Sequence, residues 1–163
     1  MQTHPMPNRK PSALERGLVS GSIAAVLSTV VLAIQSKKEA KSALSAQNAV
    51  SHWIWGEEAK HKHELSVRHT VLGYAIHHAS AVFWGLIYER LVRSKRPLSP
   101  PAELLRASAF ATVANIVDYR LTPNRLKPGF EHHLSKKSLV FVYAAFAAGL
   151  AAGHLLQQRH DGE

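Results

Sequence analysis

Three long stretches without a charged side chain limit what this chain can fold into. Residues 18–34, 70–88 and 138–158 contain no Asp, Glu, Lys or Arg. A helix on the surface of a soluble bundle carries charged residues every three or four positions, on the face that meets water. As helices these stretches would be roughly 25 to 32 Å long, which is about the thickness of the hydrocarbon layer of a bilayer. They therefore predict membrane-spanning helices rather than the core of a soluble protein.

A fourth segment, residues 103–121, is a weaker candidate for a membrane span. Arg106 lies near its start, and Asn115, Asp118 and Arg120 lie near its end. Long charged side chains near the ends of a helix can reach the two interfaces of a bilayer, so this helix can still span. The alternative is an amphipathic helix that lies on the membrane surface.

We predict one all-α membrane domain that covers residues 1–163, with four transmembrane helices in an antiparallel, up-down bundle. The expected spans are residues 17–35, 70–90, 103–121 and 138–158. The connection at residues 36–69 is expected to contain an interfacial helix. Trp53 and Trp55 in this connection suit the headgroup level of a bilayer, because an indole ring is half apolar and half polar.

The positions of the basic residues suit the loops of a membrane protein rather than a nucleic-acid-binding surface. The formal net charge is +9, but Lys and Arg lie between the apolar stretches and form no basic stripe. They are divided almost equally between the two sides of a four-span bundle, so the positive-inside rule does not orient it. Arg9, Lys10 and Arg16 precede the first stretch as in a signal peptide, whereas Lys37 and Lys38 directly follow it. Charges at that position favour a retained anchor.

Small residues spaced four apart mark two predicted contact faces. They are Gly17, Gly21 and Ala25 in the first span, and Ala145, Gly149 and Gly153 in the last. Small residues allow helix backbones to approach closely in lipid, where burial of apolar surface drives association only weakly. We expect the first and last helices to cross at these positions. A homodimer that uses the same residues is the alternative.

Four polar residues form the candidate functional cluster. His77 and His78 lie inside the second stretch, and Asp118 and Tyr119 lie at the end of the third helix on the same predicted side. Ionisable groups at membrane depth are costly and usually face a protein interior or water. A carboxylate beside an imidazole would suit a proton relay, a pH sensor or the outer shell of a metal site. We favour a structural role, in which these histidines hydrogen-bond to a neighbouring helix or to lipid head groups, and we predict no bound metal ion and no cofactor.

Other residue types exclude several chemistries. The chain has no cysteine, which excludes disulfides, thiolate catalysis and Cys-ligated metal centres. It contains no Gly-rich phosphate loop, GxSxG elbow or HExxH pair, so we predict that it is not an enzyme.

Charged residues also flank the turn between the second and third helices. Glu89 with Arg90 and Arg93, and Glu103 with Arg106, predict ion pairs across this turn. Exposed pairs of this kind contribute only about 0 to 1 kcal/mol.

Residues 83–89 (FWGLIYE) and 118–131 (DYRLTPNRLKPGFE), with the Ala- and Gly-rich last helix, resemble small uncharacterised multi-pass inner-membrane proteins of proteobacteria. The resemblance covers roughly the second half of the chain. It implies a bacterial origin and a location in the inner membrane, and it supplies no catalytic residue.

We expect a non-catalytic accessory, assembly or stress-related membrane component. Its expected partners are the lipid bilayer and other membrane proteins or a second copy of the chain, not nucleic acid. The alternative is proton-linked transport, or pH or metal sensing, through His77, His78 and Asp118.

Overall fold

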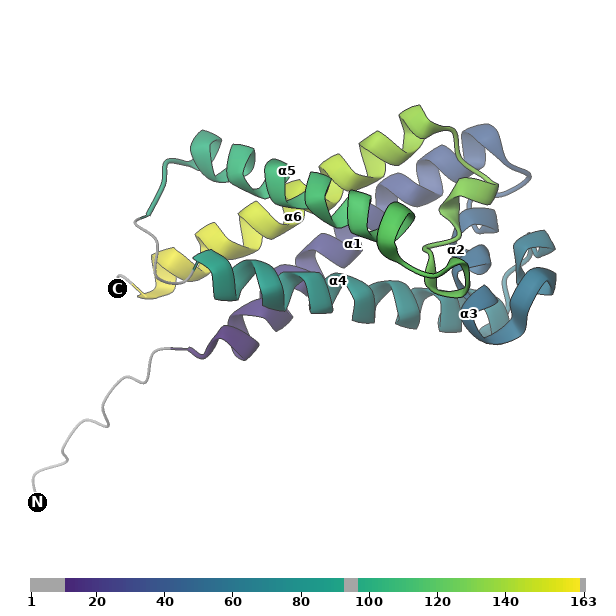
Figure 1. Cartoon of the computed structure of the whole chain (residues 1–163), viewed down its shortest axis with the longest axis horizontal. Coiled ribbons are helices and arrows are strands. Elements are labelled where there is room, and N and C mark those ends of the chain that lie inside the picture. The colour runs from purple at the N-terminus through teal and green to yellow at the C-terminus, as the bar shows by residue number, and fades with distance from the viewer. Residues whose placement is uncertain (1–10, 93–96, 162–163) are drawn as a thin grey trace, which may run out of the picture.

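Four long helices lie side by side in the computed structural model, which describes residues 11–92 and 97–161 (Figure 1). These helices are α1 (Ala13–Glu39), α4 (Leu72–Val92), α5 (Pro100–Ile116) and α6 (Lys136–Asp161). The described residues contain no β-strand, so the prediction of an all-helical chain is confirmed. Arg9, Lys10 and Arg93 lie outside the described ranges.

Short helical elements join the long helices at one end of the molecule. Between α1 and α4 are α2 (Ser45–Val50), α3 (His52–Trp55), η1 (Gly56–His61) and the π-helical turn η2 (Val67–Val71). Between α5 and α6 are the π-helical turn η3 (Val117–Leu121), η4 (Asn124–Leu126) and η5 (Phe130–His132). We call residues 40–66 and 122–135 together the cap, which lies at the right of Figure 1.

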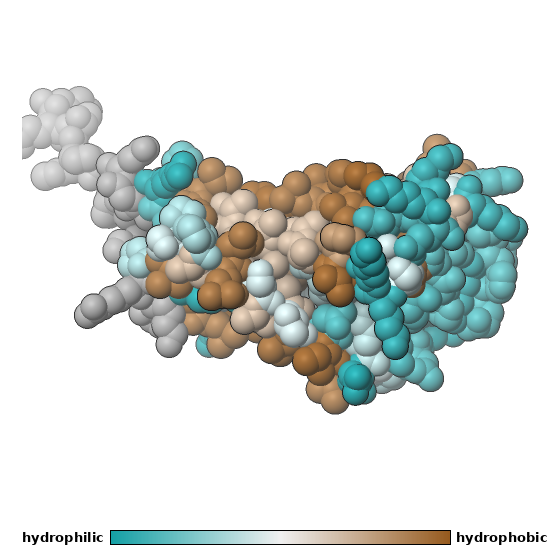
Figure 2. Space-filling model, turned by 90° about the horizontal axis from the view of Figure 1, so that it is seen from above, coloured by the Kyte–Doolittle hydropathy of each residue, from teal (hydrophilic) through white to brown (hydrophobic). Residues whose placement is uncertain are grey.

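Three helical segments are long and apolar enough to cross a membrane. They are Ala13–Glu39, Val67–Val92 and Lys136–His160. The shorter α5, which we predicted as a fourth and weaker span at residues 103–121, is not among them. In Figure 2 apolar side chains cover much of the middle of the visible face, and polar side chains gather at the cap. This distribution is typical of a membrane protein, because soluble proteins rarely expose large continuous apolar patches.

Local hydrogen bonds fix both ends of α1. Ser12 caps its first turn, since Ser12 Oγ accepts a hydrogen bond from the backbone N–H of Glu15 at 3.2 Å and the Glu15 carboxylate accepts one from the N–H of Ser12. At the other end the Glu39 carboxylate accepts hydrogen bonds from the N–H of Ser135 at 2.6 Å and from Ser138 Oγ at 2.7 Å. Glu39 therefore ties the end of α1 to the start of α6.

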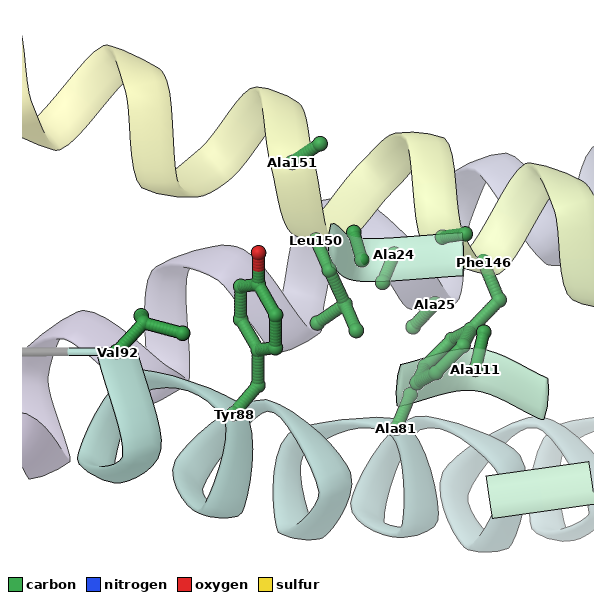
Figure 3. Packing of buried hydrophobic residues seen from close by; sticks show 11 residues of the cluster. Ala24, Ala25, Ala81, Tyr88, Val92, Ala111, Phe146, Leu150 and Ala151 are labelled. Carbon is green, nitrogen blue, oxygen red and sulfur yellow. The ribbon is translucent and has the colours of Figure 1, made fainter. Parts of the chain in front are cut away.

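The core between the long helices is made mostly of alanine (Figure 3). Its buried alanines are Ala24 and Ala25 of α1, Ala81 of α4, Ala107 and Ala111 of α5, and Ala147 and Ala151 of α6. Tyr88, Phe146 and Leu150 are the large side chains among them. Such small side chains allow close approach of helix backbones, the mode of packing that is favoured in lipid.

Glycines bring α1 and α4 into direct backbone contact. A Cβ atom added at Gly17 would lie 2.6 Å from Leu86 Cα, and one added at Gly21 would lie 2.6 Å from Val82 Cα. On the opposite side of this contact, a Cβ at Gly85 would lie 2.7 Å from Gly21 Cα. The glycines of the first helix thus face α4, not the last helix as we expected.

A second glycine contact joins α6 to α1. A Cβ added at Gly149 would lie 2.3 Å from Ala24 Cα, and one added at Gly153 would lie 2.5 Å from Ser20 Cα. Ala145, one turn earlier, is half-buried. The first and last helices do cross closely, but α1 contributes alanine and serine to this crossing because its glycines are used against α4.

Candidate functional site

A cavity of about 370 Å³ lies between α4, η3 and α6, beneath the cap. Aromatic side chains make up much of its wall: Trp53, Phe83, Trp84, Phe130, Tyr143 and Phe146. Its polar lining residues are Ser28, His77, Ser80, Asp118 and Thr122. A concave, mostly apolar space with a few polar groups is the usual form of a small-molecule site.

Asp118 is the carboxylate of this cavity. The π-helical turn η3 continues α5 and carries Asp118 toward α4 and α6. Trp84 Nε1 donates a hydrogen bond to Asp118 Oδ1 at 3.2 Å, and the Tyr143 hydroxyl donates one to Oδ2 at 2.6 Å. The carboxylate is therefore held by two aromatic side chains from two different helices. π-Helical turns are frequent at functional sites.

The other residues of the predicted cluster have separate partners. His77 lines the same cavity as Asp118, but its Nε2 atom is 3.0 Å from Ser28 Oγ of α1. His78 Nε2 is 3.1 Å from Ser22 Oγ, also on α1, and Tyr119 stacks edge-on against Tyr143 with ring centroids 6.3 Å apart. The structure thus brings His77 and Asp118 to one cavity without a hydrogen bond between them.

Ser28 of α1 and His77 of α4 form a hydrogen-bonded pair. His77 Nε2 lies 3.0 Å from Ser28 Oγ, and the Ser28 hydroxyl lies 2.7 Å from the carbonyl oxygen of Ala24 in its own helix. This pair joins α1 to α4.

Trp53 and Trp55, the predicted interface anchors, are both tied into the cap. Trp53 Nε1 donates to the carbonyl oxygen of Lys127 at 2.8 Å, and its side chain lines the cavity. Trp55 Nε1 donates to the carbonyl oxygen of Arg68 at 3.0 Å, and the Arg68 guanidinium lies 4.3 Å from the centre of the Trp55 ring. Trp53 therefore faces the protein, and Trp55 is partly exposed.

Histidines of the cap lie close together without forming a metal site. The rings of His63 and His133 are 5.7 Å apart, and His133 Nε2 donates to the carbonyl oxygen of Lys60 at 2.9 Å. Burial lowers the pKa of both His63 and His133 from the usual value, which favours neutral imidazoles. Among the described residues, no three His, Asp or Glu side chains are placed to hold a metal ion together.

A second polar cluster, which we call the ionic network, joins all four long helices at the end opposite the cap. Its members are Arg16 of α1, Tyr88 and Glu89 of α4, Glu103 and Arg106 of α5, and His154 of α6. Glu89 and Glu103 are fully buried, at 0% exposure. The expectation of exposed ion pairs at these carboxylates is wrong, because both side chains turn into the bundle.

His154 is at the centre of the ionic network. Its Nδ1 atom is 2.9 Å from Glu89 Oε2, and its Nε2 atom is 3.4 Å from the Arg106 guanidinium. Arg16 Nε lies 3.5 Å from the same Glu89 oxygen, while Glu103 contacts both Arg106 and the Tyr88 hydroxyl.

The sequence pattern predicted ion pairs for Glu89, Glu103 and Arg106 but did not identify Arg16 and His154 as partners. Arg16, Glu89, Arg106 and His154 all lie near helix ends on the same side of the predicted four-span bundle. Charges of opposite sign at matching depths on different helices indicate pairing, because isolated charges are costly there.

Comparison with known proteins yields no relative. No family model, curated protein or solved structure matches this chain.

Proposed function

We propose that this chain is a multi-pass integral membrane protein of a bacterial inner membrane, in which α1, α4, α5 and α6 cross the bilayer as an antiparallel bundle. Its role is non-catalytic: it is a small accessory component, and the cavity beneath the cap is a binding site. The resemblance of residues 83–89 and 118–131 to proteobacterial inner-membrane proteins supports the location.

The observation that carries this proposal is the inverted polarity of α5. One of its two charged residues, Glu103, is fully buried, whereas Leu105 is 73% exposed and Val113 is 55% exposed. A soluble helix would bury the apolar side chains and expose the carboxylate. An apolar outer face with paired charges inside suits a helix surrounded by lipid.

The order of contacts along the helices supports an antiparallel bundle. Residue numbers that rise along α1, from Gly17 to Gly21, face falling numbers in α4, from Leu86 to Val82. The same relation holds between α1 and α6, where Ser20 faces Gly153 and Ala24 faces Gly149.

The alternative of a proton-linked or metal-sensing cluster has less support. His77, His78 and Asp118 have different hydrogen-bond partners, which come from α1, α4 and α6. A homodimer through the predicted glycines is also less supported. Gly17, Gly21, Gly149 and Gly153 are all used in contacts within one chain.

The topology can be tested with single cysteines, since the chain has none of its own. His61→Cys, Leu98→Cys and Asn124→Cys each place one thiol in an exposed position between the long helices, and Arg159→Cys places one in the exposed last turn of α6. Sealed vesicles are treated with a membrane-impermeant maleimide before and after permeabilisation. The four-span bundle predicts that positions 98 and 159 share one side and that positions 61 and 124 share the other.

Two outcomes would contradict this topology. If α5 lay on the membrane surface, position 124 would label with position 98, and position 159 would label with position 61. If alkaline carbonate released the unmodified chain from membranes, the protein would not be integral, and the whole proposal would fail.

A further inference from the structure

The cavity beneath the cap combines an aromatic wall with a carboxylate. Trp84 and Tyr143 hold the two oxygens of Asp118, and Phe83, Phe130 and Phe146 supply further ring surface. Aromatic faces attract cations, and the attraction strengthens where water is excluded. The two kinds of group together favour a positively charged ligand that also has apolar surface.

The carboxylate of Asp118 has no permanently charged partner among the described residues of the cavity wall, and the imidazole of that wall, His77, contacts Ser28 instead. Within the described part of the chain, the lining residues include no Lys and no Arg. The two hydrogen bonds to the carboxylate come from an indole N–H and a phenol, which are both neutral donors. The nearby Arg125 guanidinium donates instead to the carbonyl oxygens of Trp53 and Ile54, at 2.9 and 3.1 Å. A carboxylate in a mostly apolar site is stabilised by an opposite charge, and a ligand can supply it.

The mouth of the cavity is apolar. Phe83 is 56% exposed and Leu126 is 45% exposed, and both line the cavity from its outer side. In the proposed bilayer arrangement Phe83 lies on the outer surface of α4, so a ligand dissolved in the membrane can reach the cavity from the side.

We propose that this cavity binds a small lipophilic cation, with its positive charge at Asp118 and its apolar groups against the aromatic wall. This inference rests on the proposed membrane location and adds the ligand class. The charged group can belong to a free organic cation or to the quaternary ammonium of a lipid head group.

The test uses two ions of one shape and opposite charge. Tetraphenylphosphonium and tetraphenylborate are each titrated into the purified full-length protein in a nonionic detergent, and binding is measured by equilibrium dialysis and calorimetry. We expect saturable binding of the phosphonium ion, and binding of the borate ion that is weaker by at least about tenfold. Equal affinity for the two ions, or no saturable binding of the phosphonium ion, would overturn the proposal.

Variants then locate the site. Asp118→Asn should weaken phosphonium binding by at least about tenfold, because it removes the charge and keeps the shape. Phe83→Ala, at the exposed mouth, should weaken it by about threefold through the lost ring surface. Glu64→Gln removes an exposed carboxylate of the cap and should leave binding unchanged. Unaltered affinity in both Asp118→Asn and Phe83→Ala would place the binding elsewhere and overturn the proposal.

Two further measurements separate the possible explanations of these results. Circular dichroism and size-exclusion profiles of each variant establish that it is folded, and Phe83→Ala tests the site even if Asp118→Asn does not fold. Competition with a short-chain phosphatidylcholine assigns the natural cation to a lipid head group if it displaces the phosphonium ion, and to a free cation if it does not. Failure of ligand binding would leave the cysteine-labelling result intact, so the two proposals fail independently.

Discussion

Glu89 is a fully buried carboxylate at the junction of three long helices. It contacts Arg16 of α1 and His154 of α6, and His154 contacts Arg106 of α5. A buried ion pair contributes little net stability compared with an apolar pair, but removal of one partner leaves a charge without compensation. The ionic network therefore adds little net stability. Its main effect is to fix the position of each helix along the axis of the bundle.

We expect Glu89→Gln to lower the free energy of unfolding by about 3 kcal/mol, because Arg16 and His154 lose their shared carboxylate. Thermal unfolding of the purified protein in detergent, followed by size-exclusion chromatography, measures the loss. Glu64→Gln is the matched control, since Glu64 is exposed in the cap. Equal unfolding temperatures for the two variants would show that Glu89 is not held as described.

The long helices associate through two kinds of contact, which are close packing of small residues and polar contacts between charged side chains. α1 packs against α4 and α6 through glycine, alanine and serine, with backbones almost touching. α5 packs through Ala107, Ala111 and Ala114, and Glu103 and Arg106 add polar contacts to Tyr88 of α4 and His154 of α6. α5 differs from the other three long helices, because it is not among the helices that are long and apolar enough to cross a membrane. Its polar contacts therefore add to its alanine packing.

Gly149→Val should disrupt the contact between α6 and α1. Even the first added carbon would lie 2.3 Å from Ala24 Cα, and backbone atoms cannot move aside without separating the helices. Overpacking of this kind costs about 1–3 kcal/mol, which unfolding in detergent can measure. Ala144→Val adds similar bulk on the exposed face of the same helix and should have little effect. Comparable losses in both variants would contradict the contact.

The whole molecule has an apolar bundle with the cap at one end (Figures 1 and 2). The ionic network joins the long helices at the other end. Residues of the cap line part of the cavity, and Asp118 and His77 line that cavity at the end of the bundle nearest the cap. The two polar centres are therefore separated along the bundle, with the alanine core between them (Figure 3).

This arrangement predicts that the chain can be divided without losing its assembly. Residues 1–98 and 99–163, expressed together as two fragments, should co-purify in detergent, because α6 packs along α1 and α5 packs on α6. An affinity tag on one fragment measures recovery of the other. Gly149→Val combined with Gly153→Val in the second fragment should reduce this recovery, and fragments that separate without these substitutions would contradict the packing.

Local sequence patterns predict where the helices of this chain lie and which of them are apolar enough to cross a membrane. Charge-free stretches at residues 18–34, 70–88 and 138–158 predicted three spans, and the structure has three helices that are long and apolar enough at these places. Helix formation and hydrophobic length depend on consecutive residues, so a sequence contains this information directly. The charged residues within residues 103–121 likewise marked this segment as a weaker span than the other three.

Which residues of different helices contact one another depends on how each helix is rotated about its axis. Only the tertiary structure decides this rotation. Gly17 and Gly21 face α4 although their spacing also suited α6, and Asp118 meets Trp84 and Tyr143 rather than a histidine. Glu89 and Glu103 are buried although they border a turn that looked exposed. A rotation of one helix about its axis changes every such contact and leaves its sequence pattern the same, because contacts between helices join residues that are far apart along the chain.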